Sequence, residues 1–186
     1  ILHRLGFTLD WFRNLTFRNY DGISKLANQD GRNFIFLHSY PPHPPYLFNK
    51  DGDKFEDMKT LNWGNDNWDK KTHFIEQLQY VNIRLLKNIK KLINDSKKPP
   101  IIIIQGDHGP ASTLGGGSLS SIEFDKLDDH KGLKERFRVL NAIYAPNDIV
   151  GFKEKNFSIV NTFRLIMNNY FGLNLKLLEN KSFVST

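Results

Sequence analysis

The chain has 186 residues, of which 39% are hydrophobic and 13% aromatic, and its 26 basic and 20 acidic side chains give a formal net charge of +6. This composition is too apolar for a disordered chain, and the length allows one core, so we expect a single domain over residues 1–186. The basic residues are spread out and not interleaved with aromatic ones, which argues against nucleic-acid binding. The absence of cysteine excludes disulfides, thiolate metal sites and cysteine nucleophiles.

No apolar stretch approaches the roughly 20 residues that a membrane-spanning helix needs. The sequence opens at Ile1, and its only methionines are Met58 and Met167. We therefore expect a piece of a longer protein, in which any membrane attachment lies in upstream segments.

The first elements in chain order are a helix and a strand. Residues 9–30 combine apolar and polar side chains at spacings that predict a helix ending near Asp30-Gly31. Phe34-Ile35-Phe36-Leu37 is a short continuous apolar run, which predicts a buried strand that ends at His38.

A stiff loop follows this predicted strand. The prolines at 41, 42, 44 and 45 fix φ and remove four backbone donors, so the segment can be neither helix nor central strand. His43 lies in the middle of these prolines. The residues that follow, up to about 67, indicate a long irregular loop, and such loops are often functional.

The clearest helical pattern extends over residues 68–97 and stops at Pro99-Pro100. Its apolar residues recur at helical spacing: Phe74, Ile75, Leu78, Val81, Leu85, Ile89 and Leu92. The next segment, Ile101-Ile102-Ile103-Ile104, predicts a strand buried on both faces. A strand, a long helix and a second strand form a βαβ crossover, so we expect the two strands to be parallel.

The remaining elements are less regular. The triple glycine at 115–117 lies among serines and predicts a flexible loop. A third strand is predicted over residues 138–145, and a helix over 159–170 with Gly172 as its C-cap.

Asp107 and His108 follow the isoleucine strand, between Gly106 and Gly109. Ligands bind at the carboxyl ends of the strands in open α/β sheets, and a carboxylate beside an imidazole is half of a divalent-metal site. The alternative is an ordinary strand-end turn, in which Asp and Gly are common. Both side chains reach one ion only if the chain bends after the strand, which the two glycines permit.

His38 and His43 are the other candidates. Prolines hold His43 in place, which favours a functional role over that of a casual surface histidine. His38 ends the first predicted strand and could also be a half-buried structural histidine. Either could ligate a second metal, hold a substrate oxyanion or protonate a leaving group. If the strands are parallel, His38 and Asp107-His108 face one crevice.

Several of these segments together resemble the sulfatase-like branch of the alkaline phosphatase superfamily, in particular the C-terminal half of bacterial membrane-anchored sulfatase-like proteins. The similar stretches are residues 34–38 with Pro42-His43-Pro44-Pro45-Tyr46, residues 101–110, residues 135–142 and residues 160–164. The Asp-His-Gly motif gains specificity from its spacing to the proline-histidine loop.

The resemblance implies a three-layer α/β/α sandwich with a mainly parallel sheet, here an incomplete alkaline-phosphatase-like domain. It also implies hydrolysis or transfer of a phosphate or sulfate ester, of a lipid or a cell-envelope glycan, at the extracytoplasmic face of a bacterial membrane. Asp107 and His108 match metal ligands for Mn²⁺, Zn²⁺, Ca²⁺ or Mg²⁺. His43 matches a catalytic and substrate-binding histidine, and His38 a substrate-binding one.

The sequence departs from the family in one respect. No strand that ends in an acidic residue and leads to a Thr or Ser nucleophile precedes residue 30. We therefore expect the nucleophile in an upstream segment and an inactive isolated chain. A non-catalytic binding or structural module that keeps the sulfatase-like fold is the alternative.

Overall fold

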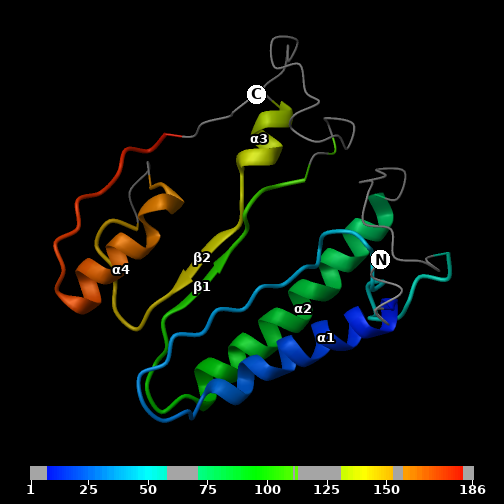
Figure 1. Ribbon diagram of the computed structural model, residues 1–186, viewed down its shortest axis with the longest axis horizontal. Helices are drawn as coiled ribbons and strands as arrows, with labels where there is room; N and C mark the ends of the chain where they lie inside the picture. The colour runs from blue at the N-terminus through cyan, green and yellow to red at the C-terminus, as the bar shows by residue number, and fades with distance from the viewer. Residues whose placement is uncertain (1–7, 58–70, 111, 113–130, 153–156, 182–186) are drawn as a thin grey trace. The chain divides into compact units, whose positions relative to one another are not determined.

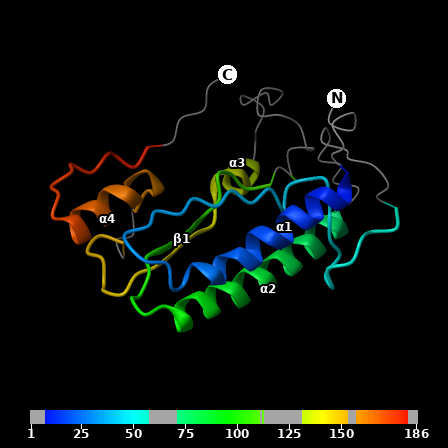
Figure 2. The ribbon, with the colours of Figure 1, turned by 60° about the horizontal axis from the view of Figure 1, so that its bottom comes forward.

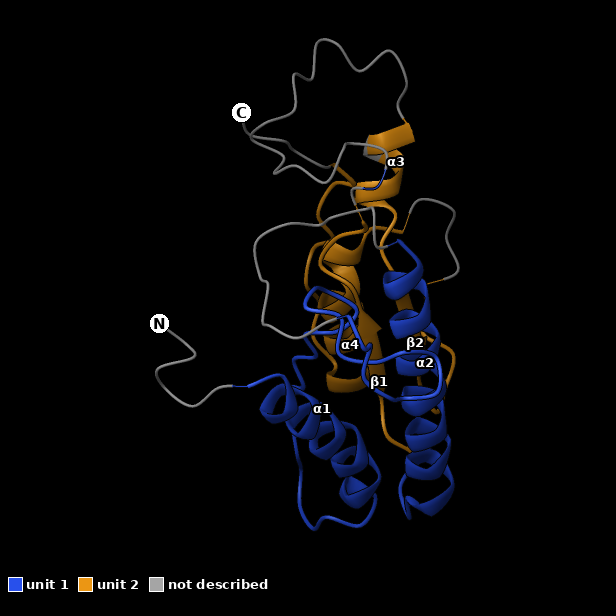
Figure 3. Cartoon of the chain, turned by 90° about the vertical axis from the view of Figure 1, so that its right-hand side faces the viewer, with its two compact units in different colours: residues 1–98, 111–118 blue, residues 99–110, 119–186 orange. Residues whose placement is uncertain are grey.

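The computed structural model describes residues 8–57, 71–110, 112, 131–152 and 157–181. The chain divides into two compact units, residues 1–98 with 111–118 and residues 99–110 with 119–186 (Figure 3). The expectation of one domain over residues 1–186 stays a prediction.

The first unit begins with helix α1, Leu9–Ile23. The Thr8 hydroxyl caps it by accepting a hydrogen bond from the Trp11 N–H at 3.1 Å, and Asp10 places a negative charge in the first turn, where the helix dipole favours it. A 3-10 turn, η2, continues over Ser24–Leu26. The helix predicted over residues 9–30 is confirmed, but it ends earlier than predicted.

Helix α2, Lys71–Asp95, lies beside α1 and runs in the same direction (Figures 1 and 2). Their core contains Tyr20, Ile23 and Val81, with Leu85 and Leu92 packed against it. Val81, Leu85 and Leu92 of the predicted apolar stripe thus form the packing face of α2 in this core, whereas Ile75 of the same stripe is exposed. The predicted residues 68–70 lie outside the described part. No helix among the described residues is both long and apolar enough to cross a bilayer.

The segment Phe34–Leu37 corrects a prediction. It is not a strand, and its apolar side chains are exposed, Phe34 by 77% and Phe36 by 80%. An apolar run becomes a strand only when a neighbouring strand pairs with it, and the sheet among the described residues contains only two other segments.

These two strands, β1 (Ile102–Gln105) and β2 (Asn141–Tyr144), belong to the second unit (Figure 1). They pair antiparallel, with Ile103 opposite Ile143. Both predicted strands are confirmed, β1 shifted by one residue from the predicted 101–104 and β2 shorter than the predicted 138–145. The expected parallel βαβ pairing is not formed in the described part, because residues 34–37 do not enter the sheet. The β1 isoleucines are accordingly half-buried rather than buried.

The helices of the second unit are α3, Lys131–Phe137, and α4, Thr162–Phe171, which follows the 3-10 turn η7, Ile159–Asn161. The sequence did not predict α3. The predicted C-cap is confirmed, since Gly172 has φ 68° and its N–H donates to the Met167 carbonyl. The core of this unit contains Ile149, Leu165 and Ile166.

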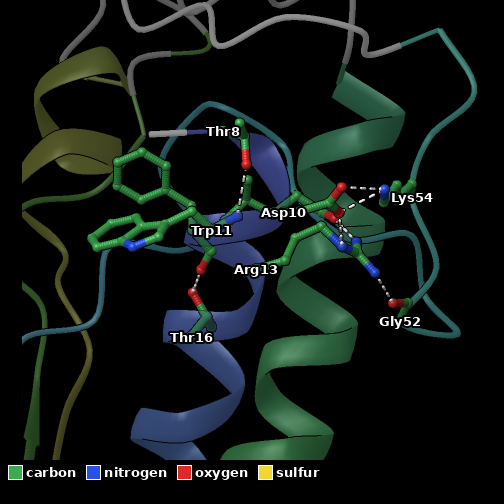
Figure 4. A network of polar contacts seen from close by, with 9 residues as sticks. Thr8, Asp10, Trp11, Arg13, Thr16, Gly52 and Lys54 are labelled. Atoms are coloured by element: carbon green, nitrogen blue, oxygen red, sulfur yellow. Dashed lines mark hydrogen bonds and ion pairs between the residues drawn. The ribbon is translucent and has the colours of Figure 1, made fainter. Parts of the chain in front are cut away.

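A buried arginine ties α1 to the loops before α2 (Figure 4). The Arg13 guanidinium donates to the carbonyls of Leu47 and Gly52, the latter at 2.9 Å, and lies 4.8 Å from the centre of the Phe48 ring. Burial lowers the pKa of Arg13, and the nearby Asp10 carboxylate acts in the opposite direction. The arginine therefore supplies donors to a region that would otherwise bury bare carbonyls.

Replacing Arg13 by methionine removes both donors but keeps much of the apolar volume. We expect R13M to destabilise the first unit by about 2 kcal/mol or more, because a buried acceptor without a partner carries its desolvation cost. All three tryptophans lie in this unit, so urea unfolding followed by tryptophan fluorescence measures the change. The exposed Arg18 on the same helix gives the control R18M, which should shift stability by less than about 0.5 kcal/mol. Equal effects of the two variants would contradict this role.

Candidate active site

The proline-histidine loop, residues 39–48, is packed into the first unit. Pro41, Pro44 and Pro45 are buried, and the chain from Tyr46 to Phe48 is buried as well. The Pro41-Pro42 and Pro44-Pro45 peptide bonds are cis. The loop is therefore a fixed part of the fold, as its prolines predict, and His43 is exposed in its middle.

The His43 ring has a defined orientation. Its Nδ1 atom lies 2.6 Å from the Pro44 carbonyl oxygen, and the ring packs against Tyr40 at 4.8 Å between centres, nearly edge to face. A carbonyl only accepts hydrogen bonds, so Nδ1 carries the hydrogen. The other ring nitrogen, Nε2, then keeps its lone pair for a proton, a substrate group or a metal ion.

His38 is exposed and lies at the edge of a cavity of about 170 Å³ beside α1. Phe12, Tyr20 and Tyr40 also line this cavity. The exposed position does not fit the alternative of a half-buried structural histidine. A substrate-binding role for His38 stays a prediction.

The loop is anchored to α1 through Tyr20. Its hydroxyl lies 2.5 Å from Ser39 Oγ, which in turn donates to the Pro41 carbonyl at 3.3 Å. Burial raises the pKa of Tyr20, and the hydrogen bond with Ser39 acts in the opposite direction. The phenol therefore stays neutral and able to donate at physiological pH.

Asp107 and His108 lie in a bend two residues after β1. His108 Nε2 is 3.5 Å from Asp107 Oδ2, and the two side chains are 40% and 87% exposed. His108 Nδ1 lies 3.1 Å from the Gly109 carbonyl, and the tautomer with the hydrogen on Nδ1 donates to it and leaves the Nε2 lone pair for an ion. The predicted bend is confirmed, and it places both side chains on one side of the chain.

Two hydrogen bonds with Arg136 of α3 hold this bend in place. The Gly109 N–H donates to the Arg136 carbonyl at 2.7 Å, and Arg136 Nη1 donates back to the Gly109 carbonyl at 2.8 Å. A Cβ on Gly109 would lie 1.9 Å from the Glu135 carbonyl oxygen. Gly109 is thus required by the close approach of α3, whereas the nearest atom to a Cβ on Gly106 would be 3.7 Å away.

The pair fits part of a divalent-metal site. A carboxylate oxygen and an imidazole nitrogen at metal-bonding distance on a tetrahedral ion are about 3.4 Å apart, close to the observed 3.5 Å. The Nδ1 hydrogen bond of His108 is the usual outer contact of a metal-binding histidine. Among the described residues, no group of three or more His, Asp or Glu side chains could hold an ion, so further ligands are needed.

The four predicted site residues are divided between the units. His38 and His43 belong to the first, and Asp107 and His108 to the second. Their convergence on one crevice stays a prediction.

The sequence did not point to the residues that hold the two loops. Gln77 binds the proline-histidine loop and Arg136 binds the Asp107-His108 bend. The sequence does contain a signal for Gln77, because it is a polar residue within the apolar stripe of α2. The sequence contains no comparable signal for Arg136, because α3 itself was not predicted.

Comparison with known families agrees with these features. A family model described as Sulfatase matches residues 10–135, which include both loops and more than half of the chain, so the chain belongs to the sulfatase family. This family implies an alkaline-phosphatase-like α/β fold and a hydrolase-type function on sulfate esters, generally with a divalent metal ion. No curated protein and no solved structure matches the chain.

The two glycines of the bend give a matched test. We expect Gly109→Ala to destabilise the second unit by about 2 kcal/mol or more, because its Cβ would collide with the backbone of α3. Gly106→Ala should change stability by less than about 1 kcal/mol, since its Cβ meets only ordinary contacts. Calorimetric unfolding of both variants measures the difference. Similar melting of the two would show that the loop does not depend on this close approach.

Proposed function

We propose that this chain contributes the metal and substrate residues of a metal-dependent hydrolase or transferase that acts on phosphate or sulfate esters. The proposal rests on one observation. Asp107 Oδ2 and His108 Nε2 lie 3.5 Å apart, and both residues belong to the segment that the sulfatase family model matches. When His108 Nδ1 donates its hydrogen to the Gly109 carbonyl, Nε2 is the ring nitrogen that can bind the ion.

Each residue has a chemical task in this proposal. Asp107 and His108 hold the divalent ion, which when bound neutralises negative charge on the ester oxygens. When Nε2 of His43 is protonated, it donates a hydrogen bond to a substrate oxygen and can give that proton to the leaving group. His38 contributes a further contact to the substrate.

The nucleophile is proposed to lie in a segment upstream of this chain, as expected from the sequence. The same segment would complete a three-layer α/β/α sandwich with a mainly parallel sheet. In that sandwich residues 34–37 would find a pairing partner, which is consistent with their exposed apolar side chains.

The setting is proposed from the same resemblance. The substrate would be an ester of a lipid or a cell-envelope glycan, reached at the extracytoplasmic face of a bacterial membrane. Both phosphate and sulfate are tetrahedral oxyanions that accept similar donors, so the two histidines suit either ester.

Metal titration tests the ligand assignment. We expect the 186-residue chain to bind one Mn²⁺ or Zn²⁺ by isothermal titration calorimetry, and the double variant D107A/H108A to lose this binding by at least about 100-fold, because both ligands are removed. The exposed Asp30 gives the control D30A, which should bind as the wild type does. Unchanged binding by the double variant would refute the assignment. Absence of binding by the wild type would show that Asp107 and His108 do not suffice to hold an ion in this chain.

Turnover tests the missing nucleophile. We expect the isolated chain, supplied with Mn²⁺, to hydrolyse neither a nitrophenyl phosphodiester nor a nitrophenyl sulfate above the rate of free Mn²⁺, because the ion and the histidines alone form no covalent intermediate. The assay is spectrophotometric, with D107A/H108A as the blank. Metal-dependent turnover that this variant loses would place the nucleophile within these 186 residues.

A further inference from the structure

Gln77 is a fully buried amide on the packing face of α2. Its exposed fraction is 0%, and Val81 follows it one turn later in the core. Burying an amide is unfavourable unless its donors and its acceptor find partners. Each polar atom of the Gln77 side chain therefore needs a hydrogen-bond partner within the fold.

All of the polar atoms of the Gln77 side chain bind the proline-histidine loop. Oε1 accepts the Leu47 N–H at 2.6 Å, and Nε2 donates to the carbonyls of Pro42 at 3.1 Å and His43 at 3.3 Å. The partners also fix which atom is oxygen and which is nitrogen, because an N–H can only donate and a carbonyl can only accept.

The two carbonyls lie on either side of the His43 Cα atom. The Pro42 carbonyl belongs to the peptide plane before it, and the His43 carbonyl to the plane after it. Holding both planes fixes the φ and ψ angles of His43, since these angles describe how the two planes are rotated about one Cα atom. One side chain thus fixes the backbone from which the imidazole projects.

The prolines make this help necessary. Pro42 and Pro44 have no N–H, so the loop around His43 cannot satisfy its carbonyls with a regular ladder of its own. Donors must come from neighbouring elements, and Gln77 brings two of them on a rigid helix.

We propose that Gln77 is a positioning residue for His43, which sets the backbone so that Nδ1 donates to the Pro44 carbonyl and Nε2 stays free for the substrate. The proposal deepens the proposed function, because it concerns the histidine to which that function gives the substrate oxygen. Gln77 itself contacts no substrate and acts through the loop.

The tautomer of His43 is the readout, because a residue that only stabilises the fold would not change it. Nitrogen-15 NMR of the ¹⁵N-labelled chain at about pH 8.5, above the usual histidine range, should show the Nδ1–H form at His43. In Q77M we expect a mixture with the Nε2–H form, together with about tenfold faster amide exchange at Leu47. Gln79 is exposed on the same helix, and the control Q79M should match the wild type in both measurements.

A second variant tests the amide oxygen and the amide NH₂ group of Gln77 separately. Q77E keeps an oxygen for the Leu47 N–H but replaces the donor that faces the two carbonyls. We expect Leu47 exchange within about threefold of wild type and a lost Nδ1–H preference at His43. Q77E also decides the test if Q77M loses the helical circular dichroism signal.

Three results would overturn the proposal. The first is a wild-type His43 tautomer in a folded Q77M or Q77E. The second is an equal change in Q79M. The third is loss of the helical signal in both Gln77 variants, which would assign Gln77 to the stability of the whole unit. The readout needs neither metal nor substrate, so failure of the proposed function in the metal titration would be seen separately.

Discussion

A proline-rich segment has too few backbone donors of its own, so its carbonyls depend on side-chain donors from the helices of the first unit. Four prolines between residues 41 and 45 carry carbonyls but no N–H, and most of this segment is buried. Gln77 from α2 donates to the Pro42 and His43 carbonyls of this segment, and Arg13 from α1 donates to the Leu47 carbonyl just after it. The two helices therefore pack through Tyr20 and Val81 and also hold a loop that could not fold by its own hydrogen bonds.

The same arrangement recurs in the second unit. His43 and His108 each place Nδ1 on the carbonyl of the following residue, Pro44 in one case and Gly109 in the other. In each case a long side chain from a neighbouring helix, Gln77 or Arg136, binds the backbone beside the histidine. With the hydrogen on Nδ1, Nε2 is the nitrogen left for a substrate in His43 and, beside the Asp107 carboxylate, for a metal ion in His108.

The sequence predicted the features that depend on local patterns. The stripe of α2, the glycine that ends α4, and the two strands β1 and β2 all follow from periodicity and capping. Strand pairing did not follow, because it depends on partners distant in the chain. The apolar run at residues 34–37 is an exposed segment, and β1 pairs with β2 antiparallel.

The candidate site residues could be singled out from the sequence, but the contacts that hold them could not. The sequence singled out His43, Asp107 and His108 by residue type and by their neighbours. The contacts of Gln77 and Arg136 depend on where a loop lies against a helix, and no spacing rule encodes that. The collision that makes Gly109 necessary likewise depends on α3, which is seven residues long and carries a weak sequence signal.

The predicted convergence of His43 with Asp107 and His108 is tested most directly by paramagnetic broadening in the 186-residue chain. Mn²⁺ bound at Asp107 and His108 broadens NMR signals of nuclei close to it. If the residues converge as predicted, the imidazole signal of His43 broadens together with that of His108 as Mn²⁺ is added. If the His43 signal keeps its width while that of His108 disappears, the two loops do not form one site.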